Sequence, residues 1–165
     1  MSMNDTKQSS PWLLVDDDPS LLAVTAKILR ILSGNQVVAC NHPRLALEIF
    51  LSAPDSFALL VTDIEMPDLN GFALARHLHE RRPRLPVLVI SGGAYEIADV
   101  LRAGCDAFLA KPFSPAELLA AVHKLLGIPG ADPQPWTRPQ SPGWLRPLSG
   151  FSLSMTLASS LQTRI

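Results

Sequence analysis

The sequence predicts an α/β fold in which five parallel strands form one sheet and helices cover both of its faces. Five short runs of apolar residues alternate with five segments whose apolar residues recur at helical spacing. The runs are four to six residues long and almost free of polar residues, which is typical of strands covered on both faces. Alternation of strand and helix favours a parallel sheet. At 165 residues, the chain has the length of one such domain with an appendage.

The predicted elements follow one another in order along the chain. The strands are WLLV (12–15), VVAC (37–40), FALLVT (57–62), PVLVI (86–90) and AFLA (107–110). A helix is predicted after each strand, and the five helices span 20–32, 44–51, 71–80, 95–103 and 116–126. In the last helix Leu118, Val122 and Leu125 fall on one face, which marks the side that packs against the sheet.

Charge and proline content divide the chain near residue 127. Residues 1–127 carry 11 basic and 14 acidic side chains with nine prolines, whereas residues 128–165 carry three basic side chains, one acidic side chain and six prolines. We therefore expect a flexible N-terminus at 1–10, one folded domain at 11–127 and a proline-rich, disordered tail at 128–165. The alternation FSLSMTL (151–157) in the tail is typical either of a disordered extension or of a strand that adds to a partner's sheet.

The composition argues against several classes of protein. A net charge of −1 and a pI of about 6.4 lack the basic excess of a nucleic-acid-binding protein, so we expect no direct contact with nucleic acid. The sequence has neither an apolar stretch long enough to span a membrane nor the apolar start of a signal peptide. Cys40 and Cys105 form neither a disulfide framework nor a metal-binding spacing. We expect a cytoplasmic protein that keeps both thiols reduced and does not bind membranes.

Acidic side chains follow two of the predicted strands. Asp16, Asp17 and Asp18 come directly after the first strand, and Asp63 comes after the third. If these strands are neighbours, about 4.8 Å apart, their carboxylates meet at the edge of the sheet where ligands of parallel sheets bind. Grouped carboxylates repel one another unless a cation joins them, and Mg²⁺ or Mn²⁺ prefers such oxygen ligands. The pattern therefore predicts a metal site.

Simpler explanations were weighed for three residues near these strand ends. Asp18 precedes Pro19 at the start of a helix, and a helix N-cap is the better explanation for its carboxylate. One cap is enough, so capping does not account for the two preceding aspartates. Ser91 follows the fourth strand, where it can be a turn residue before Gly92 and Gly93. Lys111 follows the fifth strand, and an apolar run before a proline is an unusual place for a solvated lysine.

Four motifs in the same order resemble the receiver domain of bacterial response regulators. They read LLVDDDPS (13–20), VTDIEMPDLNG (61–71), VISGG (89–93) and FLAKPF (108–113). Each motif alone is a weak signal, but the four together are specific, and the resemblance covers 11–127. It implies the flavodoxin-like, doubly wound sheet with strand order 2-1-3-4-5, which periodicity alone does not determine.

The resemblance also implies how the acidic residues act. Asp63 would be the phosphoacceptor, which takes a phosphoryl group from a histidine kinase or a histidine phosphotransfer protein. Asp17 would bind Mg²⁺ or Mn²⁺ directly and Asp16 through water, while Asp63 and the backbone carbonyl of Glu65 would complete the protein ligands. Lys111 would pair with the phosphoryl group, or with Asp63 before phosphorylation.

The switch residues are implied in the same way. Ser91 would hydrogen-bond a phosphoryl oxygen and draw its loop inward. The Lys111–Pro112 peptide bond is a candidate for the cis form, although most such bonds are trans. Phe108 stands at the aromatic switch position of the family, where it is either a switch or simply part of the core. A downstream protein would bind the face formed by the fourth helix, the fifth strand and the fifth helix.

The sequence therefore predicts a single-domain response regulator that catalyses only its own phosphorylation and dephosphorylation. The fourth helix is short for the family, and we expect the proline-rich segment after residue 126 to form no output domain. One alternative is a phospho-independent interaction module, which the complete set of site residues argues against. Another is a Mg²⁺-dependent phosphohydrolase with an aspartate nucleophile, but such enzymes need a second catalytic aspartate and a cap over the substrate, for which the chain has no room.

Overall fold

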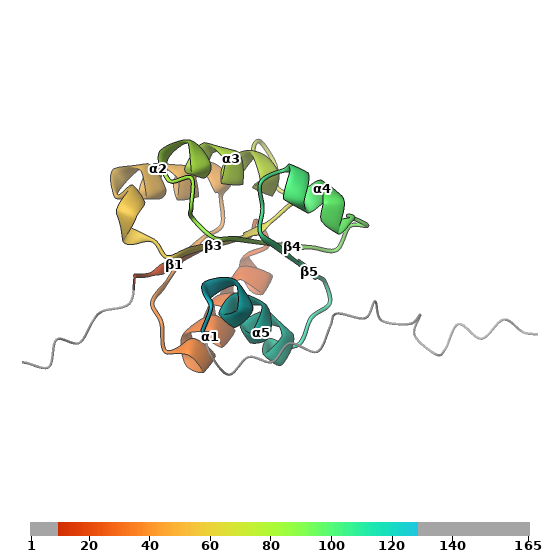
Figure 1. Cartoon of the computed structure of the whole chain (residues 1–165). Coiled ribbons are helices and arrows are strands. Elements are labelled where there is room, and N and C mark those ends of the chain that lie inside the picture. Colours follow the sequence, from red (N-terminus) through yellow and green to blue (C-terminus); the bar gives the residue numbers. More distant parts are fainter. Residues whose placement is uncertain (1–9, 129–165) are drawn as a thin grey trace, which may run out of the picture. The chain divides into compact units, whose positions relative to one another are not determined.

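A computed structural model describes residues 10–128 and confirms the predicted fold class. Five parallel strands form one sheet in the order β2-β1-β3-β4-β5 (Figure 1). They are β1 (Trp12–Val15), β2 (Val37–Cys40), β3 (Leu59–Asp63), β4 (Val87–Ser91) and β5 (Ala107–Ala110). The N-terminal segment predicted at 1–10 and the tail predicted at 128–165 lie outside the described residues, apart from Ser10 and Ile128.

Helices cover both faces of this sheet. The helices are α1 (Pro19–Ser33), α2 (Pro43–Ser52), α3 (Gly71–Arg81), α4 (Ile97–Arg102) and α5 (Pro115–Leu126), with a short 3₁₀ helix, η1, at Pro54–Ser56. α1 and α5 lie on one face, and α2, α3 and α4 lie on the other (Figure 1). The residues of β1 are all apolar because both faces of the strand are buried. Trp12 and Leu14 join the core under α1, and Leu13 and Val15 join the core on the opposite face.

Side chains of the preceding loops cap the N-termini of most of the helices. Asp18 accepts hydrogen bonds from the backbone N–H groups of Ser20 and Leu21, so it caps α1 as the sequence predicts. Ser114 and Glu117 form a reciprocal capping box at the start of α5. In contrast, α4 has six residues and no side-chain cap. The short fourth helix is thus shorter still than the predicted 95–103.

Two strand boundaries differ from the prediction in a way that matters for the site. β3 covers Leu59–Asp63 in place of 57–62, and β4 covers Val87–Ser91 in place of 86–90. Asp63 and Ser91 are therefore the last residues of their strands, where the ladder of backbone hydrogen bonds still orients them. Both are buried, with exposed fractions of 8% and 0%.

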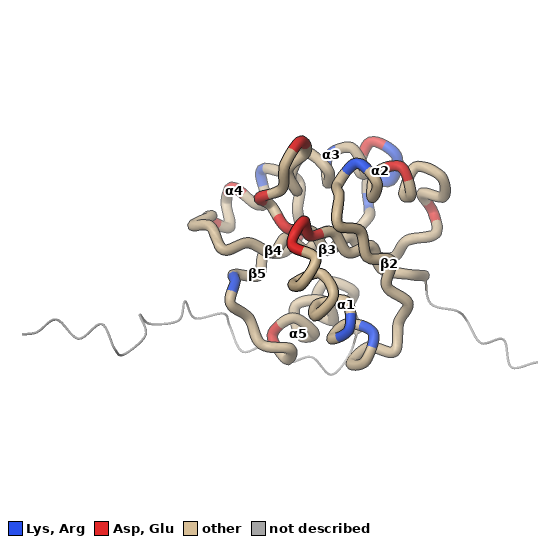
Figure 2. The backbone as a smooth tube through the Cα atoms, turned by 180° about the vertical axis from the view of Figure 1, so that it is seen from behind, with Lys and Arg blue, Asp and Glu red and all other residues tan. Residues whose placement is uncertain are grey.

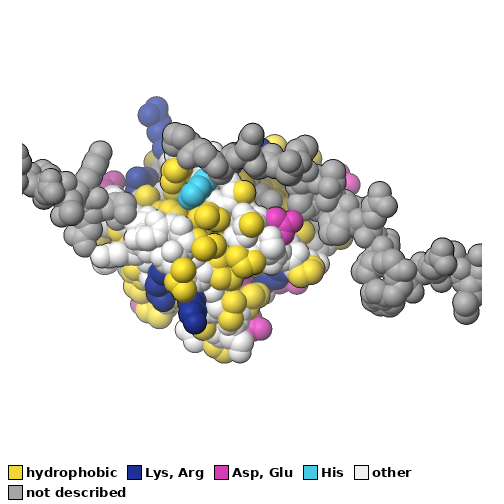
Figure 3. Space-filling view, turned by 90° about the horizontal axis from the view of Figure 1, so that it is seen from below, with side chains coloured by type: hydrophobic (Ala, Val, Ile, Leu, Met, Phe, Trp, Pro, Cys, Tyr) yellow, Lys and Arg dark blue, Asp and Glu magenta, His cyan; other side chains and the backbone are white. Residues whose placement is uncertain are grey.

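Apolar side chains are also exposed on the helical surface. Seen from the side of α1 and α5, hydrophobic side chains gather into a patch (Figure 3). The exposed large apolar residues of α1 are Val24, Ile31 and Leu32. Among the described residues, no helix has both the length and the hydropathy needed to cross a membrane.

Candidate functional site

The strand order brings four of the predicted site residues to one edge of the sheet. β1 lies between β2 and β3, so Asp16 comes out beside the end of β3, where Asp63 stands. Ser91 ends β4 opposite Ala110, and Lys111 follows directly on β5. Seen from behind, acidic positions gather near the labels of β3 and β4 at the centre of the molecule (Figure 2). The common edge follows from the parallel arrangement, since all carboxyl ends lie on the same side.

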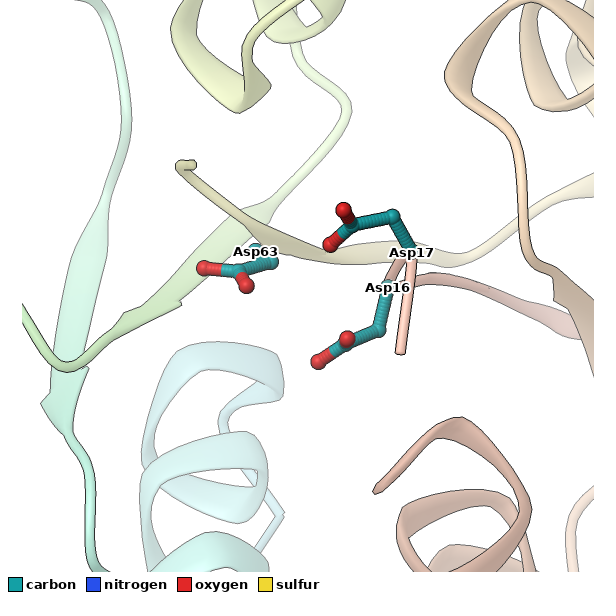
Figure 4. Close-up of side chains that lie close together, drawn as sticks. All are labelled: Asp16, Asp17 and Asp63. Atoms are coloured by element: carbon teal, nitrogen blue, oxygen red, sulfur yellow. The ribbon is translucent and has the colours of Figure 1, made fainter. Parts of the chain in front are cut away.

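Three carboxylates converge at this edge. Asp16, Asp17 and Asp63 each offer an oxygen, and these oxygens all lie within 4.8 Å of one another. Asp16 and Asp63 are only 6% and 8% exposed, whereas Asp17 is exposed. Figure 4 shows the carboxylates of the neighbouring residues Asp16 and Asp17 leaving the loop after β1 in different directions, with Asp63 on the adjacent strand. The cluster is therefore buried at Asp16 and Asp63 and open to solvent at Asp17.

Lys111 supplies the positive charge that this cluster needs. Its Nζ donates to Asp63 Oδ2 at 2.8 Å and to Asp16 Oδ2 at 3.2 Å. The backbone N–H of Lys111 donates to the carbonyl oxygen of Ser91 at 2.9 Å, and the Lys111–Pro112 peptide bond is cis. Burial alone would lower the pKa of Lys111, but the hydrogen bond to Asp63 and the two carboxylate charges outweigh it and raise that pKa. The lysine thus stays charged in the cluster.

Backbone N–H groups hold the carboxylates in place. Asp63 Oδ1 accepts from the backbone N–H of Ile64 at 2.7 Å and from that of Glu65 at 3.4 Å. Asp16 Oδ1 accepts from the backbone N–H of Asp18 at 3.0 Å. Burial raises the pKa of Asp16, and the Asp18 hydrogen bond and the Lys111 charge oppose this rise. The orientation of both buried carboxylates is therefore set before any ligand binds.

The loop after β3 begins α3 very close to the end of the strand. The backbone N–H of Gly71, the first residue of α3, donates to the carbonyl oxygen of Ile64 at 3.0 Å. A Cβ atom at position 71 would overlap the carbonyl oxygen of Asp63, so only glycine fits there.

His42 contacts the same loop from the start of α2. Its Nε2 lies 3.5 Å from Asp68 Oδ2, while its Nδ1 accepts from the backbone N–H of Arg44 and caps α2.

The two predicted switch residues lie on the β4–β5 side. The Oγ of Ser91 accepts from the backbone N–H of Gly93 at 3.0 Å, and the serine hydroxyl keeps its own hydrogen for a further acceptor. Phe108 is partly buried against the core on the side of α2, α3 and α4. This packing suits both a switch and a core residue, so the role of Phe108 stays a prediction.

A contact between the loops after β3 and β4 was not predicted from the sequence. The hydroxyl of Tyr95 donates to Glu65 Oε1 at 3.4 Å, and the Tyr95 ring packs edge-on against Phe72 with 5.7 Å between ring centroids. The two partners of the hydroxyl contact are 30 positions apart, so periodicity could not have paired them. The one available signal is that Tyr95 is the only tyrosine of the chain and follows the Gly92-Gly93-Ala94 segment.

The carboxylate oxygens suit a small divalent cation. Mg²⁺ lies about 2.1 Å from each oxygen that it binds and so joins oxygens that are up to about 4.2 Å apart. The oxygens of Asp16, Asp17 and Asp63 all lie within 4.8 Å of one another, close to that limit. All three donors are hard oxygens, the type that Mg²⁺ and Mn²⁺ prefer. The residues present therefore fit such an ion.

Comparisons with known sequences agree with this geometry. A family model described as response regulator receiver domain matches residues 12–123. The response regulator protein FleR of Pseudomonas aeruginosa is 33% identical over 124 residues, which are 73% of this chain and 26% of FleR. The chemotaxis protein CheY homolog of Campylobacter jejuni is 27% identical over 119 residues, which cover 70% of this chain and 91% of that protein.

Solved structures show the same architecture. The response regulator receiver protein from Sinorhizobium medicae has a TM-score of 0.65 and 31% sequence identity, over 74% of this chain and 98% of that one. A CheY-like receiver domain protein from Methanospirillum hungatei has a TM-score of 0.65 and 30% identity, over 72% of this chain and 94% of that one. The chain spans about a quarter of FleR and 17% of the putative two-component response regulator ARR21 of Arabidopsis thaliana.

Proposed function

Because this chain belongs to the response regulator receiver domain family, we propose that it accepts a phosphoryl group on Asp63 and thereby switches a partner-binding face. The donor is a histidine kinase or a histidine phosphotransfer protein. The observation that carries this proposal is the ion pair of Lys111 Nζ with Asp63 Oδ2, at 2.8 Å, inside a cluster of three carboxylates. A lone buried aspartate at a strand end would not need a cluster of this kind.

The proposed transfer uses groups that are already oriented. An oxygen of the Asp63 carboxylate attacks the phosphorus, the P–N bond to the donor imidazole breaks, and the electron pair leaves with the ring nitrogen. Lys111 offers its positive charge to the phosphoryl oxygens, on which negative charge accumulates. The N–H groups of Ile64 and Glu65 hold the acceptor carboxylate in its orientation.

A divalent cation is part of this proposal. Asp16, Asp17, Asp63 and the backbone carbonyl of Glu65 would hold Mg²⁺ or Mn²⁺, with the exposed side of Asp17 open to solvent. When bound, the ion supplies positive charge that offsets the negative charge of the phosphoryl oxygens. The family module is a signalling unit, and in this proposal its chemistry is limited to its own phosphorylation and dephosphorylation.

The proposed switch runs from Ser91 toward α4. Ser91 and Lys111 contact the phosphoryl group only in the phosphorylated state, and this difference in contacts shifts the conformational equilibrium. The responding surface comprises α4, β5 and α5, with Phe108 on β5 as a candidate relay. Ile97 and Leu101 of α4 are 60% and 58% exposed, which supports a protein contact there. Action as a single domain in the cytoplasm is also proposed.

Phosphorylation with a small donor tests the proposal. The whole chain is incubated with Mg²⁺ and acetyl phosphate, and intact-mass measurement looks for one added phosphoryl group. We expect the wild type to gain it and Asp63→Asn not to gain it, while both variants show the same circular dichroism spectrum. No gain by the folded wild type contradicts the function, and a gain by Asp63→Asn contradicts the assignment of the acceptor. Rapid multiple turnover of phosphomonoesters would instead indicate a phosphohydrolase.

A further inference from the structure

A buried polar side chain stands directly before the proposed acceptor. Thr62 is the fourth residue of β3, and 0% of its surface is exposed. Its Oγ1 donates to the carbonyl oxygen of Asp63 at 2.9 Å. Burial of a hydroxyl group in an apolar core is unfavourable unless a hydrogen bond compensates for it, so this contact is what makes a threonine acceptable there. Neither the carboxylate cluster nor the ion pairs of Lys111 involve this hydroxyl.

One peptide unit joins this hydroxyl to the acceptor carboxylate. The trans peptide bond between Asp63 and Ile64 carries both the carbonyl oxygen that Thr62 binds and the N–H of Ile64. That N–H donates to the carbonyl oxygen of Ile90 in β4 at 3.2 Å and to Asp63 Oδ1 at 2.7 Å. Because a trans peptide unit is planar and its C=O and N–H point in opposite directions, holding the carbonyl also fixes the direction of the N–H.

The carbonyl of this peptide unit points away from β4 and requires a donor of its own. β1 pairs with β3 only as far as Val15, which lies opposite Thr62, so in the described sheet no residue of β1 pairs with Asp63. The first residue of α3, Gly71, lies close against the same oxygen, and a Cβ atom there would be 2.0 Å from it. The Thr62 hydroxyl thus supplies a donor that the β1 ladder does not.

We propose that Thr62 is a positioning residue whose hydroxyl, through the peptide unit between Asp63 and Ile64, orients the carboxylate that accepts the phosphoryl group. This inference rests on the proposed function. With Oδ1 held by the N–H of Ile64, Oδ2 faces Lys111 Nζ at 2.8 Å. In phosphorylation by acetyl phosphate, a carboxylate oxygen of Asp63 attacks phosphorus, the bond from phosphorus to the acetyl oxygen breaks, and the electron pair leaves with acetate. A carboxylate that is less firmly oriented reaches this geometry less often, so the transfer slows.

Two substitutions at position 62 separate the hydroxyl group from the volume of the side chain. Thr62→Val replaces the hydroxyl with a methyl group, and we expect phosphorylation at saturating Mg²⁺ and acetyl phosphate to slow roughly three- to tenfold, the range that one hydrogen bond controls. Thr62→Ser keeps the hydroxyl and should react at close to the wild-type rate. Because the substitution changes the orientation of the acceptor and not the binding of the donor, the half-saturating concentration of acetyl phosphate should stay the same in both variants.

The peptide unit can also be observed without any phosphoryl transfer. Amide hydrogen exchange followed by NMR reports on the N–H of Ile64, and we expect this N–H to exchange faster in Thr62→Val than in the wild type or in Thr62→Ser. Thr25→Val serves as the matched control, because Thr25 of α1 is the other buried threonine among the described residues, with 3% of its surface exposed. It should change neither the rate of phosphorylation nor the exchange of the Ile64 N–H.

The possible outcomes separate this inference from the proposed function. If Thr62→Val is slow, Thr62→Ser is normal and exchange rises at Ile64 but not across the rest of β3, the positioning role is supported. If Thr62→Val reacts at the wild-type rate, or slows only in step with a lower melting temperature and faster exchange throughout β3, the role is wrong and the function stands. If the folded wild type gains no phosphoryl group while Ile64 still responds to Thr62→Val, the hydrogen-bonded link exists, but the proposed function fails and the role in phosphorylation falls with it.

Discussion

Two helices, α1 and α4, each follow a strand that contributes to the site, yet they are held very differently. α1 has 15 residues, a side-chain cap from Asp18, a left-handed Gly34 at its end and four buried residues. α4 has six residues, no side-chain cap and one buried residue, Val100. The two helices lie on opposite faces of the sheet (Figure 1).

This difference in anchoring places the proposed phosphoryl chemistry beside the firmly held α1 and the proposed conformational response at the weakly held α4. The loop before α1 carries Asp16 and Asp17, and a well-anchored helix keeps their geometry constant. The segment before α4 carries Tyr95, and its helix exposes Ile97 and Leu101 to solvent. Regions with few buried contacts open at low cost in free energy, and moving elements are drawn from such regions. We therefore expect α4 to move and α1 to stay.

The largest expected effect is the loss of a buried leucine from α1. Leu29 is fully buried, so Leu29→Ala should lower the free energy of unfolding by about 2–5 kcal/mol, because it removes apolar contacts and leaves a cavity. Urea denaturation followed by circular dichroism measures this change. A much smaller loss would mean that α1 is not the anchored helix of the pair.

An identical substitution at two sites makes the comparison sharper. Val122 of α5 and Val100 of α4 are both buried. Val122→Ala should lower the global free energy of unfolding by roughly 1–2 kcal/mol. Val100→Ala should lower it less and instead speed up amide hydrogen exchange in 97–102, because α4 opens without the rest of the domain. Equal global losses would contradict a weakly held α4.

The next effect concerns the charge that holds the α1 side of the site. Lys111→Ala should slow phosphorylation by acetyl phosphate by roughly 100-fold or more, which is typical when one group that stabilises developing charge is removed. Asp16 and Asp63 then stay buried without their cation, so the variant should melt at a lower temperature without Mg²⁺ and gain more from added Mg²⁺ than the wild type does.

A matched control separates this effect from a general loss of positive charge. Lys124→Ala removes an exposed lysine from the last turn of α5. It should leave both the rate of phosphorylation and the response of the melting temperature to Mg²⁺ unchanged. A normal rate for Lys111→Ala would show that its ion pairs are structural only.

The fold was largely predictable, since every strand is covered on both faces and reads as a short apolar run. Its boundaries were less so. Asp63 looked like a loop residue because it is polar, and Phe57 looked like a strand residue because it is apolar, although β3 ends at the first and excludes the second. The order of the strands depends on tertiary contacts and came only from the resemblance to a family.

The site was predictable where polar residues stand at the end of a strand or directly after it, as at Asp16, Asp63 and Lys111. Their contacts were not, because Lys111 and Asp16 are 95 positions apart and meet only in the folded sheet. The capping role of His42 was also missed, although it has a local signal. A polar residue stands directly before Pro43, which opens α2. The contact of Tyr95 with Glu65 has no local signal of this strength.

A smaller effect is expected when α4 receives the cap that α1 already has. Glu96 precedes α4 in an extended conformation suited to an N-cap residue, but its side chain makes no capping hydrogen bond. Glu96→Asp should supply one and stabilise the helix by about 1 kcal/mol, seen as slower hydrogen exchange in 97–102. Asp18→Ala, the reverse change at α1, should cost a similar amount of global stability. No change in exchange for Glu96→Asp would mean that other contacts limit the opening of α4.

The smallest effect is a pKa change in the segment before α4, and the single tyrosine makes it measurable. Burial, and then the charge and hydrogen bond of Glu65, raise the pKa of Tyr95 above its ordinary value of 10.0. Absorbance at the tyrosinate band should therefore have its midpoint above pH 10 in the folded protein, and circular dichroism confirms that the fold persists. Glu65→Gln should move this midpoint down toward 10.0, but not all the way, because burial remains.

The sign of the linked stability follows from the same pKa. Tyr95 holds its proton more tightly in the folded state than in the unfolded state, so its contribution to stability is complete below its ordinary pKa of 10.0 and is lost as the pH rises through the folded pKa. Glu65→Gln lowers the folded pKa and leaves the unfolded pKa unchanged, so the loss should be smaller and complete at a lower pH. If the midpoint is the same in Glu65→Gln and in the wild type, Tyr95 and Glu65 do not interact in solution, and the segment before α4 is even less tied to the site than the comparison with α1 implies.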